Sequence, residues 1–240
     1  MAIIDKPTDY FNTVLYTGNG TAIGSGGQTI SGLDFQPDWS WGKTRDDAQG
    51  HRIVDSVTGT SKQLHTNNTN AQTDDTEGLT SFTSSGFTVG SDVGWNNSGK
   101  SIVAWNWKAG GSASTNENGS IDSSVSANTT AGFSIVSYTG TGSNATVGHG
   151  LGVVPKMIIA KVRSGADNWM VGHDGIGWTH RMQLNLTNAA GALTAAWNNT
   201  APTSSVFTVG TNGTVNGNGS TYIAYCFAEK QGYSKFGSYT

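Results

Sequence analysis

The chain has 240 residues and a net charge of −3, with 12% charged and 35% hydrophobic residues. No cluster of Lys and Arg is present, so a nucleic-acid partner is not expected, and no apolar run approaches the ~18 residues of a membrane-spanning helix. Cys226 is the single cysteine, which excludes an internal disulfide. The 34 glycines and the abundant Ser, Thr and Asn favour turns and β structure over helix.

Residues 1–9 precede the first predicted strand and contain Pro7. They have no counterpart later in the chain. The segment also lacks the basic start and the long apolar stretch of a secretory signal. We therefore expect residues 1–9 to form an N-terminal arm outside the folded modules, by which the protein attaches to a larger structure.

A tandem repeat begins at residue 10. Residues 10–20 read YFNTVLYTGNG and residues 132–142 read GFSIVSYTGTG, an offset of about 120 residues. Further landmarks recur in the same order, and they include aromatic, proline and lysine positions as well as small residues. They are GL at 32–33 and 150–151, a Pro-to-Lys heptad at 37–43 and 155–161, FTVG at 87–90 and 207–210, and SIVAWNW at 101–107 against TYIAYCF at 221–227. This order predicts a duplicated unit.

Period-two alternation predicts strands within each copy. Trp105 and Trp107 alternate with small or polar residues, so we expect them on one strand face, packed against the core. The segment that starts at Pro155 is predicted to be another strand, because a proline at a strand start needs no ladder donor. Only the Ala-rich stretch 184–197 is expected to hold a short helical turn. The fold class is therefore predicted to be all-β.

The chain ends on a third echo, GYSKFGSYT at 232–240. A leftover strand would leave an unpaired edge, which sheets avoid, so we expect this segment to complete the second copy. The expected domains are the arm at 1–9, a first β-sandwich module at 10–131 and a second at 132–240, with residues 112–130 as the stretch between the modules.

Candidate catalytic and metal-binding groups are few. Asp74, Asp75 and Glu77 cluster, but they match no calcium-loop pattern and have no counterpart in the second copy, so we interpret them as a solvated acidic loop. None of the five histidines has the spacing of a zinc site. Cys226 lies in an aromatic strand and is expected to be a small core residue. No catalytic residue, metal or cofactor is predicted, and the protein is expected not to be an enzyme.

The aromatic residues are the candidates for ligand binding. Trp95, Trp178 and Trp197 lie in Gly/Asn-rich or polar surroundings, which is typical of residues carried on loops. An exposed indole can stack on a sugar, so these three are the predicted glycan-binding residues. The alternatives are that they pack under a loop or are buried against a neighbouring subunit, because interfaces favour aromatic residues.

Several motifs resemble those of a known family of virion proteins. They are YTGTG at 138–142, VGHGLGVVPKMII at 147–159, APTSSVF at 201–207 and GYSKFGSY at 232–239. Together they are similar to tail-fibre-like structural proteins of cyanophages and other marine tailed phages, which are built from repeated modules. The resemblance covers nearly the whole chain and is closest in the second copy. The first copy departs from it, with Ser31 where His149 stands and Trp39 where Met157 stands.

The resemblance implies a concanavalin A-like or jelly-roll β-sandwich in each module and a place on the phage particle surface or tail. The implied function is a non-enzymatic tail-fibre or appendage subunit that contacts other virion proteins and host-surface glycans. Such a subunit is expected to form a homo-oligomer, of which a trimer is one form. The alternatives are a capsid-decorating virion protein, a lectin-like module outside any phage, and a glycan-degrading enzyme.

Overall fold

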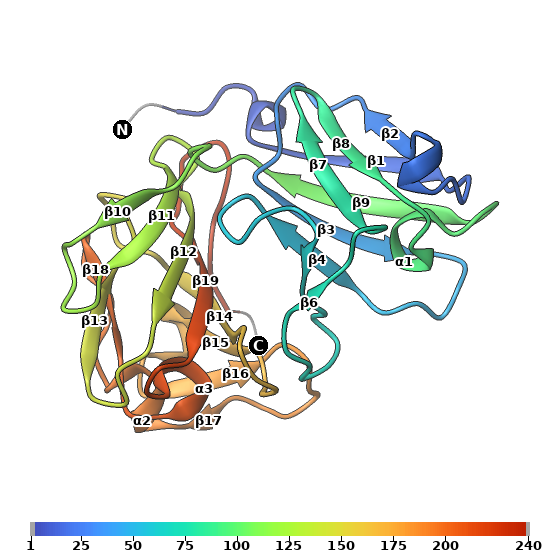
Figure 1. Ribbon diagram of the computed structural model, residues 1–240. Coiled ribbons are helices and arrows are strands. Elements are labelled where there is room, and N and C mark those ends of the chain that lie inside the picture. The colour runs from blue at the N-terminus through green and yellow to red at the C-terminus, as the bar shows by residue number, and fades with distance from the viewer. Residues whose placement is uncertain (1–2, 239–240) are drawn as a thin grey trace. The chain divides into compact units, whose positions relative to one another are not determined.

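The computed structural model describes residues 3–238 and confirms the expected all-β class (Figure 1). The chain folds into two compact units. The N-terminal unit comprises residues 6–67 and 72–109, and the C-terminal unit comprises residues 110–238 together with 3–5 and 68–71. Each unit has its own sheets and its own hydrophobic core.

The N-terminal unit is a sandwich of two antiparallel sheets. The larger sheet has the strand order β1-β9-β3-β4 and the smaller one has the order β2-β8-β7, while β5 and β6 form a short separate pair. The strands are β1 (Phe11–Thr17), β2 (Gln28–Ser31), β3 (Trp39–Thr44), β4 (Arg52–Asp55), β5 (Lys62–Gln63), β6 (Thr73–Asp74), β7 (Leu79–Thr83), β8 (Gly86–Val89) and β9 (Ser101–Trp107).

The C-terminal unit contains a longer sheet with the order β10-β11-β12-β19-β14-β15-β16-β17, and a two-stranded sheet of β13 and β18. The strand predicted after Pro155 is confirmed as β14. The strands are β10 (Ser114–Asn116), β11 (Ser123–Asn128), β12 (Phe133–Thr139), β13 (Ala145–Gly148), β14 (Met157–Val162), β15 (Met170–His173), β16 (His180–Gln183), β17 (Gly191–Ala192), β18 (Val206–Val209) and β19 (Thr221–Phe227).

Helices in the described residues are single turns. They are α1 (Val93–Asn96), α2 (Thr194–Trp197) and α3 (Gly213–Asn216), with 3-10 turns at Pro7–Asp9, Ile23–Ser25 and Asp174–Ile176. The turn expected in the Ala-rich stretch is α2. Side chains before α1 and α3 satisfy the free amides at their N-termini: Asp92 Oδ1 accepts from Gly94 N at 2.8 Å, and Asn212 Oδ1 accepts from Thr214 N at 2.9 Å.

The two units share a strand order. β1-β9-β3-β4 in the N-terminal unit corresponds to β12-β19-β14-β15 in the C-terminal unit. The pairing register also agrees, because Phe11 lies opposite Trp107 on β9 and Phe133 lies opposite Phe227 on β19. On its other side, Trp107 lies opposite Trp39, the first residue of β3. Phe227 likewise lies opposite Met157, the first residue of β14. Corresponding strands therefore pair at matching positions along their whole length.

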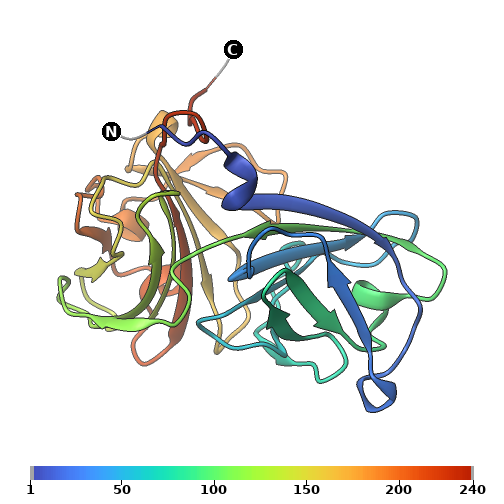
Figure 2. The same ribbon diagram turned by 90° about the horizontal axis from the view of Figure 1, so that it is seen from above.

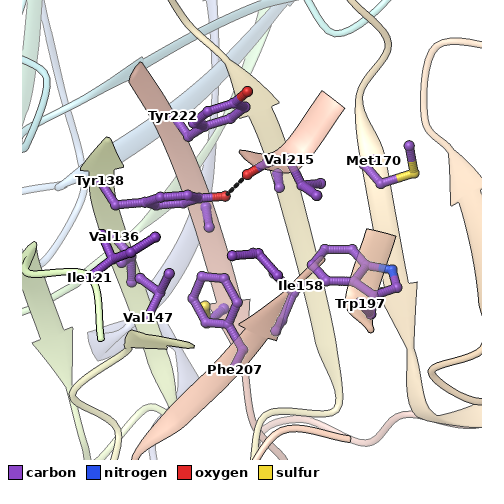
Figure 3. Packing of buried hydrophobic residues seen from close by; sticks show 14 of the residues in the cluster. Ile121, Val136, Tyr138, Val147, Ile158, Met170, Trp197, Phe207, Val215 and Tyr222 are labelled. Carbon is purple, nitrogen blue, oxygen red and sulfur yellow. Dashed lines mark hydrogen bonds between the residues drawn. The ribbon is translucent and has the colours of Figure 1, made fainter. Parts of the chain in front are cut away.

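Each unit buries a core between its sheets. The N-terminal core consists of Ile30, Val54, Leu79, Phe87, Val89, Trp95 and Ala104. The C-terminal core is larger and includes the residues labelled in Figure 3: Ile121, Val136, Tyr138, Val147, Ile158, Met170, Trp197, Phe207, Val215 and Tyr222. Fully burying one large aliphatic or aromatic side chain stabilises a fold by roughly 1.5–3 kcal/mol. Cys226 belongs to the C-terminal core, as predicted.

The structure corrects the predicted orientation of β9. Ala104 faces the N-terminal core, whereas Trp105 and Trp107 lie on the opposite face of the strand and are half-buried. There Trp107 contacts Trp39 with ring centroids 4.3 Å apart. Alternation separates the two faces of a strand, but it does not tell which face meets the core when both carry apolar groups.

The structure also differs from the expected module boundaries. Residues 110–131, which the sequence placed in the first module, contain β10 and β11, and β11 pairs with β12 of the C-terminal unit. The predicted closing strand at 232–240 is wrong for residues 232–238, which form no strand and make one isolated bridge between Lys230 and Ser234. Residues 239–240 of that segment, and residues 1–2 of the arm, lie outside the described residues.

Candidate functional site

The structure places Trp95 in the core of the N-terminal unit. One turn of helix, α1, turns this ring inward, and its side chain is 0% exposed. Its Nε1 donates a 3.1 Å hydrogen bond to Gln63 Oε1, which satisfies the buried indole. A ring with no exposed face cannot stack on a sugar, so the predicted glycan-binding role of Trp95 is corrected to a packing role.

Trp178 and Trp197 lie together in the core of the C-terminal unit. Their rings meet edge to face, with centroids 5.7 Å apart and planes at 87°. Trp197 is 0% exposed and Trp178 is 7% exposed. Both rings pack over Gly172 of β15, where a Cβ atom would come within 2.4 Å of Trp178 and 2.9 Å of Trp197. These two tryptophans are therefore packing residues as well.

A tyrosine hydroxyl is hydrogen-bonded to a single-turn helix in each unit, α1 in the N-terminal unit and α3 in the C-terminal unit. Tyr16 on β1 donates through its hydroxyl to the carbonyl oxygen of Trp95 in α1 at 2.6 Å. Tyr138 on β12 donates to the carbonyl oxygen of Val215 in α3 at 2.7 Å. Burial raises the pKa of both hydroxyls, so each remains a donor at any ordinary pH. The repeated Tyr-Thr-Gly motif in the sequence thus marks the same hydrogen bond in both units.

An asparagine holds the loop that follows this tyrosine strand. The Oδ1 of Asn96 accepts from the amide of Asn19 at 2.7 Å, and its Nδ2 donates to the carbonyl oxygen of Gly90 at 2.8 Å. Asn216 makes the same pair of bonds, from Thr141 N at 2.8 Å and to the carbonyl oxygen of Gly210 at 2.7 Å. Both asparagines are 0% exposed. We call the tyrosine and asparagine hydrogen bonds together the turn frame.

The N-terminal unit adds a charged cluster to its turn frame. Arg52 Nε lies 2.9 Å from Asp92 Oδ1, and Arg52 Nη1 donates to the carbonyl oxygen of Gly50 at 3.1 Å. The side chains of Arg52 and Asp92 are 9% and 16% exposed. A Cβ atom on Gly94 would lie 2.0 Å from the guanidinium carbon, so the glycine makes room for this ion pair.

Two titratable groups surround this ion pair. Burial raises the pKa of Asp75, and the nearby Asp92 carboxylate raises it further. Gln63 Nε2 donates to Asp75 Oδ2 at 3.1 Å, which links Asp75 to Trp95 through one amide side chain. Burial lowers the pKa of His65, and the positive charge of Arg52 lowers it further. Asp75 is thus part of an ordered cluster rather than of the solvated loop that the sequence predicted.

The corresponding positions of the C-terminal unit are uncharged. By the shared register, Met170 of β15 takes the place of Arg52, and Asn212 takes the place of Asp92. Thr214 stands where Gly94 makes room for the guanidinium. The charged cluster is therefore not required by this fold. Its ion pair orients α1 and, through the helix, Trp95.

The other groups that could carry chemistry are also engaged in the fold. His149 is 0% exposed; its Nδ1 accepts from the amide of Leu151 at 3.2 Å, and its Nε2 lies 3.2 Å from the carbonyl oxygen of Thr203. Burial raises the pKa of the Cys226 thiol to about 12, which leaves it un-ionised. No group of three His, Cys, Asp or Glu side chains within residues 3–238 is arranged to hold a metal ion.

A surface hollow of about 290 Å³ lies in the C-terminal unit beside residues 229–235. Its one acidic residue, Glu229, accepts from Lys235 Nζ at 2.9 Å and from the amide of Phe236 at 3.1 Å. Lys235, which also lines the hollow, thus pairs with the Glu229 carboxylate. None of the residues predicted from the sequence to bind a ligand lines this hollow.

Comparison with known proteins places the chain in a family. No curated protein and no solved structure matches it. No helix among the described residues is long and apolar enough to cross a membrane. One protein family matches residues 6–240, which is nearly the whole chain and both compact units. The chain belongs to that family, which is described as Domain of unknown function (DUF7483).

Proposed function

We propose that the protein is a non-enzymatic structural subunit of a bacteriophage virion, placed in a tail fibre or a related appendage. The observation that carries this proposal is that the side chains capable of chemistry make contacts within the fold. The three singled-out tryptophans, His149, Cys226 and the Arg52–Asp92 ion pair each pack or hydrogen-bond within their own unit. A catalytic site needs such groups to converge on a substrate, and these groups serve the fold instead.

We further propose that the two units descend from one duplicated module. The support is the shared strand order, the shared register and the turn frame, which is made by Tyr16 and Asn96 in one unit and by Tyr138 and Asn216 in the other. Unrelated sandwiches have no reason to repeat the same buried bonds at matching positions. Repeated modules are common in elongated assemblies, and the motifs that resemble tail-fibre-like proteins agree with this role.

Glycan binding is not part of the proposal at Trp95, Trp178 or Trp197, because their rings are buried. The Ser-, Thr- and Asn-rich composition, with only 12% charged residues, fits a subunit that contacts other proteins of the particle through hydroxyl and amide groups and bridging water. The proposed partners are therefore other virion proteins and further copies of the chain.

The test is quantitative mass spectrometry of purified virions of the phage that encodes the protein. We expect a fixed copy number relative to the major capsid protein, and absence from the particles would overturn the proposal. Immunogold labelling then separates the two virion locations: label on the tail supports an appendage, and label over the capsid supports a decorating protein. Incubation with host envelope material should release no reducing ends, and their release would contradict the non-enzymatic role.

A further inference from the structure

Strand β1 forms an open edge of its sheet. It is the last strand in the order β1-β9-β3-β4, and all seven of its residues pair with β9 without a shift in register. Figure 2 shows β1, in blue, as a long strand. An edge strand presents a row of backbone amides and carbonyls that can pair with another chain.

The corresponding edge of the C-terminal unit is covered. β12, the counterpart of β1, pairs with β19 on one side and with β11 on the other. Ser137 occupies the place that Leu15 has in β1, and it lies opposite Ser124 of β11. The same backbone edge therefore accepts an added antiparallel strand in one unit and is left open in the other.

The open edge also lacks the features that normally protect such strands. Four other outer strands of the described chain have them: β7 has a register shift between Leu79 and Ser81, β10 and β17 have three and two residues, and β4 carries Arg52 and Asp55. The sequence of β1, FNTVLYT, contains no charge, no proline and no glycine. A long, uncharged, regular edge is suited to pairing.

The hydrogen bonds at the two ends of β1 fix which groups face outward. Lys108 N donates to the carbonyl oxygen of Tyr10 at 2.8 Å, and Gly18 N donates to that of Lys100 at 2.9 Å. Even-numbered residues therefore bond to β9, and the backbone groups of odd-numbered residues face the open edge. Leu15 stands in the middle of this edge, and it is 62% exposed.

Two of the outward groups are already bonded by side chains. Asn12 Oδ1 accepts from the amide of Thr13 at 2.9 Å, and Gln28 Nε2 donates to the carbonyl oxygen of Thr17 at 2.9 Å. The amide and carbonyl of Leu15, the carbonyl of Thr13 and the amide of Thr17 have no strand beside them within residues 3–238.

This pattern is self-complementary. If two copies of β1 pair antiparallel with Leu15 opposite Leu15, then Thr13 of one copy lies opposite Thr17 of the other. The open carbonyl of Thr13 then meets the open amide of Thr17, and the two groups held by Asn12 and Gln28 lie opposite each other, so one backbone hydrogen bond can replace their two side-chain bonds. A strand with a different arrangement of open groups would place one of them opposite the Thr13 amide or the Thr17 carbonyl, which a side chain already holds.

We infer that β1 pairs antiparallel with β1 of a second copy, with Leu15 opposite Leu15 across a two-fold axis, and that this pairing makes the protein a dimer. The contact joins two four-stranded sheets into one and covers the exposed Leu15 side chain. The proposed dimer differs from the trimer, which is one form of the homo-oligomer expected from the sequence. The pairing itself is argued from the β1 edge, and only its role in assembling a virion rests on the proposed function.

The first experiment measures mass by light scattering after size-exclusion chromatography, from about 1 μM to about 1 mM protein. The wild-type chain should become a dimer within this range. Leu15→Lys places like charges opposite each other and should weaken dimerisation by about tenfold or more. Leu186→Lys is the matched control, because Leu186 is 42% exposed and lies in the other unit, and it should dimerise like wild type.

The second experiment locates the contact independently. Directly opposed residues of a hydrogen-bonded antiparallel pair have Cα atoms about 5.5 Å apart, within the range for a disulfide. Leu15→Cys should therefore form a disulfide-linked dimer under mild oxidation, whereas Leu186→Cys should not. The native Cys226 is buried and should not interfere.

A wild-type chain that stays monomeric at every concentration would overturn the inference. So would a dimer that survives Leu15→Lys, or one in which Leu15→Cys does not cross-link. The proposed function fails separately, when the protein is missing from purified virions. A monomer found in virions would remove only the β1 pairing, and a β1 dimer missing from virions would remove only the virion role.

Discussion

Tyr138 and Val215 are joined by a hydrogen bond of 2.7 Å from the tyrosine hydroxyl to the valine carbonyl oxygen, deep in the core of the C-terminal unit. Tyr138 also stacks on Tyr222, with ring centroids 5.2 Å apart. Because β12 supplies the tyrosine and α3 the carbonyl, this bond ties β12 to the turn that precedes β19. The bond between Tyr16 and Trp95 does the same in the N-terminal unit.

Removing the hydroxyl should therefore destabilise the C-terminal unit without changing its shape. Tyr138→Phe keeps the ring but leaves the Val215 carbonyl buried without its partner, which costs about 1–3 kcal/mol. Tyr16→Phe is the matched substitution in the N-terminal unit and should have a cost of the same order. Urea unfolding followed by circular dichroism measures both. A Tyr138→Phe variant as stable as wild type would show that the hydroxyl does not hold α3.

The burial of Trp197 predicts a loss of stability when its ring is removed. Trp197→Ala should cost about 3–5 kcal/mol, because truncating a buried aromatic ring leaves a cavity. Leu186→Ala, at an exposed position of the same unit, should change the free energy of unfolding by about 0.5 kcal/mol or less. Chemical denaturation of the two variants decides the point. A Trp197→Ala variant as stable as wild type would contradict the packing role and favour the exposed, glycan-binding ring that the sequence predicts.

The two units together suggest a rescue experiment on the charged cluster. Arg52→Met introduces the residue found at the matching position of the C-terminal unit, but it leaves Asp92 buried without its cation. Removing one partner of a buried pair costs about 3–5 kcal/mol. Adding Asp92→Asn, which keeps the acceptor for the amide of Gly94, should recover most of that loss.

The check is a double-mutant cycle on the free energy of unfolding, with Arg52→Met, Asp92→Asn and the double variant. Additive losses would mean that Arg52 and Asp92 do not interact in the folded protein. A coupling of about 1 kcal/mol or more between the two substitutions supports the ion pair.

The raised pKa of Asp75 predicts how stability depends on pH. Because the pKa of Asp75 in the folded protein lies above its ordinary value of 3.8, folding favours the protonated carboxyl. That contribution is fully present below pH 3.8 and is lost as the pH rises through the folded pKa. Asp75→Asn should therefore be more stable than wild type at neutral pH. The difference should shrink as the pH falls toward 3.8, as measured by urea unfolding between about pH 3 and pH 7. A difference that is constant over this range would show that the carboxyl of Asp75 is not perturbed by the fold.

The sequence predicts the strands well where the pattern is local. Alternation along 101–107 and 221–227, and the proline at 155, mark β9, β19 and β14. The echo of Tyr-Thr-Gly marks β1 and β12, the strands that begin the turn frame of each unit. These signals depend on neighbouring residues of one chain segment, so they survive in a single sequence.

The candidate site could not be predicted in the same way. Trp95 and Trp197 lie in single-turn helices, which are too short to show helical periodicity, so their surroundings resemble loops. The ion pair between Arg52 and Asp92 joins residues far apart in the sequence, and its only local trace is Gly94. The open edge of β1 depends on which strand pairs with which, and alternation within one strand carries no information about its neighbours.

The central claim is that both units are held by the same turn frame. Amide hydrogen exchange, followed residue by residue, tests it most directly, because loop glycines normally exchange fast. The two asparagines of the turn frame also accept through their backbone carbonyls: Gly20 N donates to the carbonyl oxygen of Asn96 at 3.0 Å, and Gly142 N donates to that of Asn216 at 2.8 Å. We predict that both glycine amides are protected, together with Gly18 and Gly140. Protection in one unit with free exchange at the matching positions of the other would contradict the claim.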